Sequence, residues 1–167
     1  LHYDRRRQRQ MCIRDRDCYF YHIDYSVTDL NSLMTTIQMG GANNIIRRNT
    51  MRKLGASATL NPGDAGLITL NNISDTGHMQ GDGAMVQVMT GQSPGTEISY
   101  NWLHSSVKYG ARFDGNGASN NGIMHHNVFW GLDNAGIMAK GYEFKIYNNT
   151  VLYLSLIHIS EPTRPVV

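Results

Sequence analysis

The chain has 167 residues, of which 41% are hydrophobic and 17 are Gly, with 15 Lys and Arg residues against 13 Asp and Glu residues. It contains two Cys residues and no apolar run long enough to cross a bilayer. These values exclude a membrane-spanning protein, a coiled coil and a disulfide scaffold.

The amino-terminal segment 1–16 is complementary, at the level of codons, to a segment near the other end. The reverse complement of a codon string for Met11–Arg16 translates as Leu-Ser-Leu-Ile-His, and this string stands at Leu154–His158. Inverted ends of this kind resemble the transposon adapters of sequencing libraries. We therefore interpret segments 1–16 and 154–167 as translated adapter and leave them out of the fold. The alternative is a natural basic arm that binds nucleic acid.

Setting these ends aside changes the charge of the chain. Seven of its basic and three of its acidic residues lie in the ends, which leaves eight basic and ten acidic residues in 17–153 and a formal charge of −2. The basic balance is then no reason to expect a nucleic-acid partner, and no membrane or protein partner is evident. We expect residues 17–153 to be one partial domain, an internal piece of a longer gene with both ends truncated.

An asparagine-centred repeat dominates this segment, although residues 17–42 match it only loosely. The motif is an apolar residue, two residues, Asn, one residue and an apolar residue. Its asparagines are spaced by 22, 30, 26 and 22 residues and are Asn49, Asn71, Asn101, Asn127 and Asn149. Short β-branched and aromatic runs between Gly, Asn, Asp and Ser clusters predict strands and not helices.

A second short strand begins at Gly83, Gly110 and Gly136. Two strands at fixed phase in a period of variable length predict an all-β fold, a right-handed parallel β-helix of about five coils. The repeated Asn side chains should stack at a corner and bond the turn backbone, so we assign them a structural role. Alternation places six residues on the inner face, namely Ala84, Val86, Ala111, Phe113, Ile137 and Ala139.

The repeated segments resemble the pectate-lyase-like superfamily of right-handed parallel β-helix proteins over about residues 43–153. The segments that carry the resemblance are Ile98–His104, Tyr109–Gly115, Met124–Trp130, Gly136–Gly141 and Ile146–Val151. The resemblance implies a secreted or periplasmic protein with a polysaccharide substrate, bound on the outer face of the Gly-started strands. The fold recurs in lyases, hydrolases, epimerases, phage tail proteins and adhesins, so it does not define one activity.

On that outer face, Gln87, Asp114 and Lys140 each stand four residues after the glycine and are expected to form a column, with Arg112 close by. Met85, Arg112 and Met138, two residues after the glycine, should face outward as well. Lys140 as base, its pKa lowered by a neighbouring cation, and Arg112 as stabiliser of an enolate-like intermediate would suit β-elimination, with Asp114 and Gln87 binding substrate. The alternative is an exposed ion pair without a catalytic role.

The segment Ser74–Gly83 is the longest insertion in the repeat. Long loops on a regular scaffold often carry binding residues. Asp75 and Asp82 are candidate ligands of a calcium ion, and His78 is a candidate substrate-binding residue. Ordinary turn chemistry is the alternative for this Gly- and Asp-rich segment.

Four further predictions concern isolated residues. His104, three residues after Asn101, is a third candidate acid or base, or else a polar loop residue. Trp130 is preferred over Trp102 as a platform for sugar stacking, with a lid over the core as the alternative. His125 and His126 should face opposite ways and not share a metal. Asp82 and Asp114 should lie too far apart for a glycosidase pair.

The favoured hypothesis is a secreted lyase that cleaves acidic polysaccharide by β-elimination. The alternatives are a non-catalytic carbohydrate-binding or adhesive β-helix and a glycoside hydrolase.

Overall fold

The computed structural model describes residues 14–25, 33–115 and 119–154, and every regular element in these ranges is a strand. No helix there has the length and apolar character that spanning a membrane requires. The two segments interpreted as adapter lie almost wholly outside the described residues. Strand β1 (Arg14–Arg16) and Leu154 are their described parts. The origin of both segments stays a prediction.

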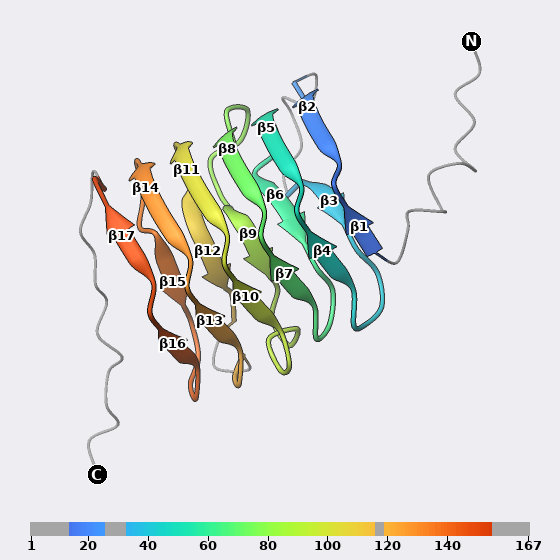
Figure 1. Ribbon diagram of the computed structural model, residues 1–167, viewed down its shortest axis with the longest axis vertical. Coiled ribbons are helices and arrows are strands. Elements are labelled where there is room, and N and C mark those ends of the chain that lie inside the picture. Colours follow the sequence, from blue (N-terminus) through green and yellow to red (C-terminus); the bar gives the residue numbers. More distant parts are fainter. Residues whose placement is uncertain (1–13, 26–32, 116–118, 155–167) are drawn as a thin grey trace.

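Seventeen strands form three parallel sheets within the described residues (Figure 1). Sheet 1 contains β1, β4 (Ile45–Arg47), β7 (Leu67–Thr69), β10 (Glu97–Ser99), β13 (Ile123–His125) and β16 (Lys145–Tyr147). Sheet 2 contains β2 (Tyr19–Ile23), β5 (Thr50–Leu54), β8 (Asn72–Thr76), β11 (Trp102–Ser106), β14 (Val128–Leu132) and β17 (Thr150–Leu152). Sheet 3 contains β3 (Thr35–Gln38), β6 (Ala58–Asn61), β9 (Ala84–Val88), β12 (Tyr109–Phe113) and β15 (Ile137–Ala139).

The chain passes through sheets 1, 2 and 3 in turn and then starts the next coil. Each strand pairs with the strand three places along the chain, as β5 pairs with β2 and β8. Figure 1 shows the strands side by side in sequence order along the solenoid. The predicted all-β parallel solenoid is therefore confirmed.

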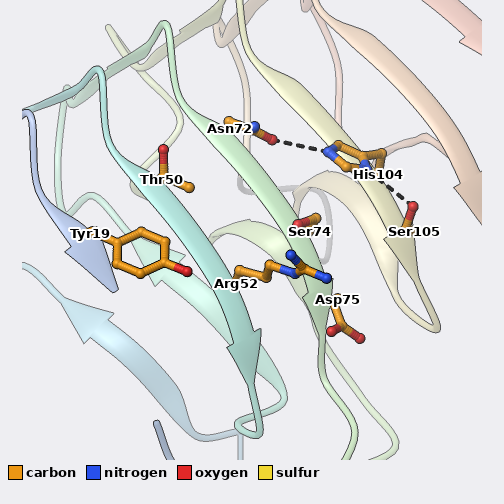
Figure 2. Close-up of a pocket in the computed structure, with 8 residues that line it drawn as sticks. All are labelled: Tyr19, Thr50, Arg52, Asn72, Ser74, Asp75, His104 and Ser105. Atoms are coloured by element: carbon orange, nitrogen blue, oxygen red, sulfur yellow. Dashed lines mark hydrogen bonds between the residues drawn. The ribbon is translucent and has the colours of Figure 1, made fainter. Parts of the chain in front are cut away.

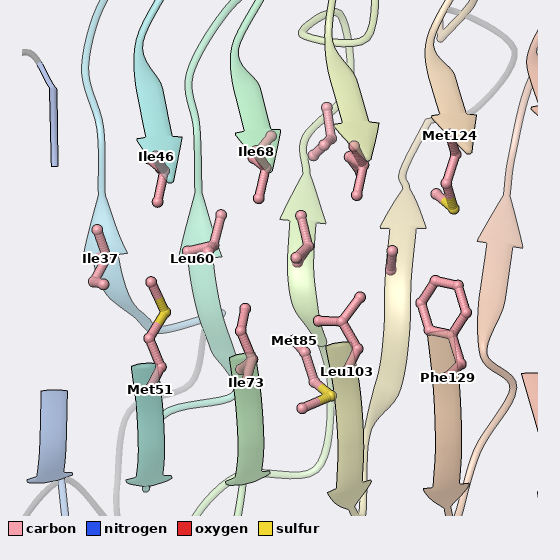
Figure 3. Packing of buried hydrophobic residues seen from close by; sticks show 14 of the residues in the cluster. Ile37, Ile46, Met51, Leu60, Ile68, Ile73, Met85, Leu103, Met124 and Phe129 are labelled. Carbon is pink, nitrogen blue, oxygen red and sulfur yellow. The ribbon is translucent and has the colours of Figure 1, made fainter. Parts of the chain in front are cut away.

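The core runs along the axis between the three sheets, because a single coil cannot bury its own apolar face. Ile46, Met51, Ile73, Leu103 and Phe129 are fully buried there, and Figure 3 shows their side chains directed into the interior. The six residues predicted on the inner face of sheet 3 are buried or partly buried against this core.

The asparagine ladder forms at the corner between sheets 1 and 2. Each Oδ1 accepts from the coil before it, with the Asn71 N–H to Asn101 Oδ1 distance at 3.0 Å and the Asn101 N–H to Asn127 Oδ1 distance at 2.9 Å. Asn101 Nδ2 also donates to the carbonyl oxygen of Ile68 at 2.9 Å. In the first coil Cys18 takes the ladder position and donates its N–H to Asn49. The predicted structural role of the motif asparagines is confirmed.

Two residues in every coil adopt the left-handed backbone conformation, and both stand at a fixed distance from the ladder. Those just before the ladder position are Asp17, Arg48, Leu70, Tyr100, His126 and Asn148. Those four residues after it are His22, Lys53, Asp75, Ser105, Gly131 and Tyr153. The second position interrupts the alternation of each sheet 2 strand, so its side chain is re-aimed as in a β-bulge.

The register of sheet 3 differs from the prediction at one strand. Ala111 pairs with Ile137 as expected. Gln87, however, pairs with Arg112 and not with the expected Asp114, so β9 is shifted by two residues relative to β12. The reason is that Gly83 and Gly110 are not equivalent. Gly83 has a φ of 103° and precedes its strand. Gly110 lies inside β12, where a Cβ would stand 2.4 Å from the carbonyl oxygen of Gly136.

A shift of two residues keeps the same faces, but the outer face of β9 is not an open groove. Met85 and Gln87 are both fully buried. The predicted column of Gln87, Asp114 and Lys140 is therefore wrong for Gln87, which pairs with Arg112 and not with Asp114. The prediction that Met85 and Gln87 are exposed is also wrong.

Candidate functional site

The outer face of sheet 2 presents two straight rows of side chains, because the strands pair in exact vertical register. Row 1 consists of Tyr19, Thr50, Asn72, Trp102, Val128 and Thr150. Row 2 consists of Tyr21, Arg52, Ser74, His104, Trp130 and Leu152. Parallel strands lie about 4.8 Å apart, so each row offers one side chain per coil at that interval.

Aromatic side chains stand at two places along these rows. Tyr19 and Tyr21 stack at 5.7 Å on β2. Three strands further on, Trp102 meets Trp130 edge to face at 5.6 Å. Trp102 is 54% exposed, whereas one face of Trp130 is covered by the His104 ring at 4.0 Å. Trp102, and not the predicted Trp130, therefore offers the freer aromatic surface.

A polar pocket of about 460 Å³ lies between the two aromatic groups. Figure 2 shows its lining side chains on the adjacent strands β2, β5, β8 and β11. They are Tyr19, Thr50, Arg52, Asn72, Ser74, Asp75, His104 and Ser105. Asp75 and Ser105 join the row residues because each occupies a left-handed position in its strand.

His104 has a polar partner at each ring nitrogen and stacks one ring face on Trp130. Nε2 lies 3.0 Å from Asn72 Oδ1 and Nδ1 lies 3.0 Å from Ser105 Oγ. A neutral ring protonated at Nε2 satisfies both partners, since it donates to Asn72 and accepts from the Ser105 hydroxyl. Burial and then the positive charge of Arg52 lower the pKa of His104, so the neutral ring is favoured near pH 7.

Arg52 is the exposed cation of this pocket. Within the described residues its guanidinium has no carboxylate partner at salt-bridge distance. It is close enough to His104 to affect that ring electrostatically. The pocket therefore combines one available guanidinium with one neutral imidazole, which suits an anionic group on a ligand.

A second charged cluster lies on sheet 3 and contains most of the residues proposed from the Gly-started strands. Arg112 Nη2 lies 2.8 Å from Asp114 Oδ2, and Lys140 Nζ lies 3.1 Å from Asp114 Oδ1. The predicted proximity of Asp114, Lys140 and Arg112 is therefore confirmed. Gln87 Nε2 donates to Asp114 at 3.2 Å.

Arg112 also binds Asp82, with Nη1 2.9 Å from Oδ1. Asp82 and Asp114 thus lie on either side of one guanidinium, so the expectation that they stand far apart is wrong. The two-residue shift of β9 accounts for the difference. A guanidinium engaged by two carboxylates leaves no gap between them for a sugar, and both of its terminal nitrogens are occupied.

These contacts shift two acid groups in the same direction. The backbone N–H of Gly83 and the Arg112 side chain lower the pKa of Asp82. Burial raises the pKa of Asp114, but the hydrogen bond from Lys140 and the charge of Arg112 outweigh it and lower that pKa overall. Both acids are therefore carboxylates over the whole neutral range.

The Ser74–Gly83 loop does not gather its two acids around one point. Asp75 Oδ1 lies 2.8 Å from His78 Nε2, whereas Asp82 binds Arg112. Among the residues that the structure describes, no three His, Cys, Asp or Glu side chains are grouped so as to hold a metal ion. A calcium ion bound by Asp75 and Asp82 stays a prediction.

Lys108 holds this loop and was not singled out by the sequence. Its buried ammonium donates to the carbonyl oxygens of Gln80 and Asp82, the latter at 2.9 Å. Burial lowers the pKa of Lys108, and the charge of Asp82 opposes this. The loop is thus tied to β12 through two backbone oxygens.

His125 and His126 do not face opposite ways as predicted. Their Nδ1 atoms lie 2.7 Å apart because His126 has a φ of 53° at the corner before Asn127. His126 stacks on Tyr100 and His125 on Tyr147. His126 thus packs against Tyr100 at the turn before Asn127.

The three candidate catalytic residues therefore belong to two separate sites. His104 and Asp75 lie in the sheet 2 pocket, with His78 next to Asp75. Arg112 and Lys140 lie on sheet 3. The sequence analysis did not predict three residues of the pocket, namely Tyr19, Asn72 and Arg52. Their positions nevertheless follow a rule, because each row 1 residue stands one residue after a ladder position and each row 2 residue stands three residues after it.

A family model described as "Right handed beta helix region" covers residues 7–151. The matched range begins inside the amino-terminal segment that we interpret as adapter. No curated protein and no solved structure matches the chain.

Proposed function

The chain belongs to the right-handed β-helix family, and we propose that it binds a polysaccharide across the outer face of sheet 2. One observation carries the proposal: exposed aromatic rings stand at two points of the face with a polar pocket between them. Aromatic faces complement the apolar faces of pyranose rings. Polar side chains in the pocket complement their hydroxyl groups.

The dimensions of the face suit a short stretch of a linear polymer. From β2 to β11 there are three strand intervals, or about 14 Å at the usual spacing of parallel strands. Tyr19 and Tyr21 would contact one end of this stretch and Trp102 the other. Arg52, Asn72 and His104 would contact the sugars between them.

A second candidate function is β-elimination at the same pocket, favoured by the neutral state of His104 beside Arg52. His104 would take the proton from the carbon alpha to a uronate carboxylate through Nδ1, once the Ser105 hydroxyl turns away. The electron pair would form the new carbon–carbon double bond as the bond to the leaving sugar oxygen breaks. That oxygen would take the proton back from the imidazolium, and Arg52 would hold the carboxylate throughout.

The Arg112, Asp114 and Lys140 cluster is the competing location for the same chemistry. Its arginine is nearly buried and engaged by two carboxylates. Its lysine is half exposed and bound to Asp114. This arrangement supports a structural role better than a catalytic one, since neither cation is available to a substrate without first leaving its partner.

Two further expectations accompany the proposal. Export from the cell would bring the protein to its polymer. A calcium ion held by Asp75 and Asp82 would add positive charge near the loop.

The test uses the full chain with two readouts, retention by polysaccharide in affinity gels and ultraviolet absorbance of unsaturated sugar ends. We expect retention that falls about fivefold to tenfold in Trp102→Ala, since an aromatic contact that the ligand buries contributes about 1–1.4 kcal/mol. Tyr142→Ala, an exposed aromatic residue away from sheet 2, should bind normally.

The outcomes separate the candidates. Absorbance that disappears in His104→Ala but persists in Lys140→Ala supports elimination at sheet 2, and the reverse result assigns it to sheet 3. Retention without absorbance leaves binding alone. Reducing ends without absorbance would indicate a hydrolase. No retention of any polysaccharide would overturn the proposed function.

A further inference from the structure

The charges on the sheet 2 face point to one class of polysaccharide. Resting on the proposed function, we infer that the polymer carries isolated anionic groups separated by uncharged sugars, and that it is not a homopolymer of uronic acid. The distribution of charged and aromatic side chains along the rows carries this inference.

Charged residues are sparse on this face. Of the twelve residues in rows 1 and 2, Arg52 is the one with a permanent charge. His104 is favoured in its neutral form because burial and Arg52 lower its pKa. One guanidinium matches one carboxylate or sulfate, and the neighbouring row positions offer hydroxyl, amide and aromatic groups.

The groups beside the rows do not add a second anion site. Lys53 Nζ lies 5.7 Å from the centre of the Tyr21 ring, where a cation–π interaction engages it. Asp75 also lines the pocket and places an acidic side chain beside Arg52. A second ligand anion next to the one on Arg52 would therefore meet repulsion from Asp75.

The aromatic ends of the face disfavour anions directly. A homopolymer of uronate places a carboxylate on every sugar, so some would lie against Tyr19 or Trp102. Trp102 is half exposed and its neighbours in register are Asn72 and Val128, neither of which carries a positive charge. Removing a carboxylate from water without a partner is unfavourable. Uncharged sugars at these positions avoid that cost.

The remaining described cations lie away from rows 1 and 2. Arg14, Arg16, Arg47 and Lys145 are on sheet 1, Arg48 pairs with Asp17 at the corner before Asn49, Lys108 is buried against the Ser74–Gly83 loop, and Arg112 and Lys140 are at sheet 3. Within the two rows Arg52 is the one cation, and it stands between the exposed aromatic residues.

Isothermal titration of the full chain with three polymers tests the inference. The probes are hyaluronan, in which uronate alternates with an uncharged sugar, polygalacturonate, in which every sugar is charged, and an uncharged β-glucan. We expect hyaluronan to bind at least about tenfold more tightly than either of the others, as one charge-assisted contact predicts. Arg52→Gln should reduce hyaluronan binding to the level of β-glucan, and the exposed Lys145→Gln should not change it.

Each other outcome has one meaning. Polygalacturonate binding as tightly as hyaluronan, or more tightly, would overturn the inference and leave the proposed function intact. Tightest binding of β-glucan would overturn it as well, because Arg52 would then recognise no charge. Failure of all three polymers to bind, with the fold intact by circular dichroism, would overturn the proposed function itself.

Discussion

Sheets 2 and 3 each carry an arginine on the outer side of the solenoid, and the two arginines have opposite surroundings. Arg112 is 7% exposed and both terminal nitrogens bind carboxylates, from Asp82 and Asp114. Arg52 is exposed in a pocket and has no carboxylate at salt-bridge distance among the described residues. Arg112 therefore stabilises the fold through its two ion pairs, whereas Arg52 is available to a ligand. Exposure and existing partners distinguish the two roles where residue type alone does not.

The largest expected difference between the two regions is in stability. Arg112→Ala leaves Asp82 and Asp114 without their shared cation and should lower the free energy of unfolding by about 2–3 kcal/mol, at the lower end for buried pairs because Asp82 is well exposed. Arg52→Ala should change it by less than about 0.5 kcal/mol. Urea denaturation of the two variants measures both values. Equal losses would contradict the division of roles.

A smaller expected difference between sheets 2 and 3 is the pH range in which each contributes to the stability of the fold. The folded pKa of His104 lies below its ordinary value of 6.5, so the unfolded chain binds the proton first. Stability from the neutral ring is complete above about pH 6.5 and declines as the pH falls toward the lower folded pKa. The pKa values of Asp82 and Asp114 are lowered from 3.8. Their contribution is complete above about pH 4 and is lost at lower pH.

Urea denaturation at a series of pH values checks this order. His104→Gln should flatten the decline between pH 7 and pH 5 and leave the decline below pH 4 as it is. Asp114→Asn should do the opposite. If His104→Gln leaves the pH profile of stability unchanged, protonation of the partly buried His104 ring is not linked to stability.

Within the sheet 3 cluster, the smallest expected effect is that of Lys140→Ala. Its ion pair with Asp114 is half exposed, and such pairs contribute less than about 1 kcal/mol. Thermal unfolding should therefore shift by a few degrees at most. A loss as large as that of Arg112→Ala would place Lys140 within the buried network and not at its rim.

Much of the fold could be predicted from the sequence because the repeated motif indicates both where each corner lies and which residues face the core. Asn71, Asn101 and Asn127 recur where a tight corner needs side-chain amides, and the apolar residues on either side of them face the core. The register of β9 could not be predicted from the glycines. Gly83 is needed for a turn with positive φ, whereas Gly110 is needed for close packing of the backbone, and the sequence does not distinguish these two roles of glycine.

The site was predictable only in part. His104 was found because it follows Asn101 by three residues, and the same spacing from Asn49 leads to Arg52. Asp75 and Ser105 could not be placed by alternation, since each has a positive φ that re-aims its side chain. That conformation depends on the coil as a whole and not on the residue type.

The asparagine ladder makes each coil interchangeable with its neighbours. From Asn49 to Asn127, each ladder residue donates its backbone N–H to the side-chain amide oxygen of the next ladder asparagine, whatever the length of the connecting loops. A gene that gains or loses one complete winding can therefore rejoin its neighbours in phase. Such proteins can lengthen or shorten in whole steps, and a binding face built on the rows grows or shrinks by one sugar-sized increment at a time.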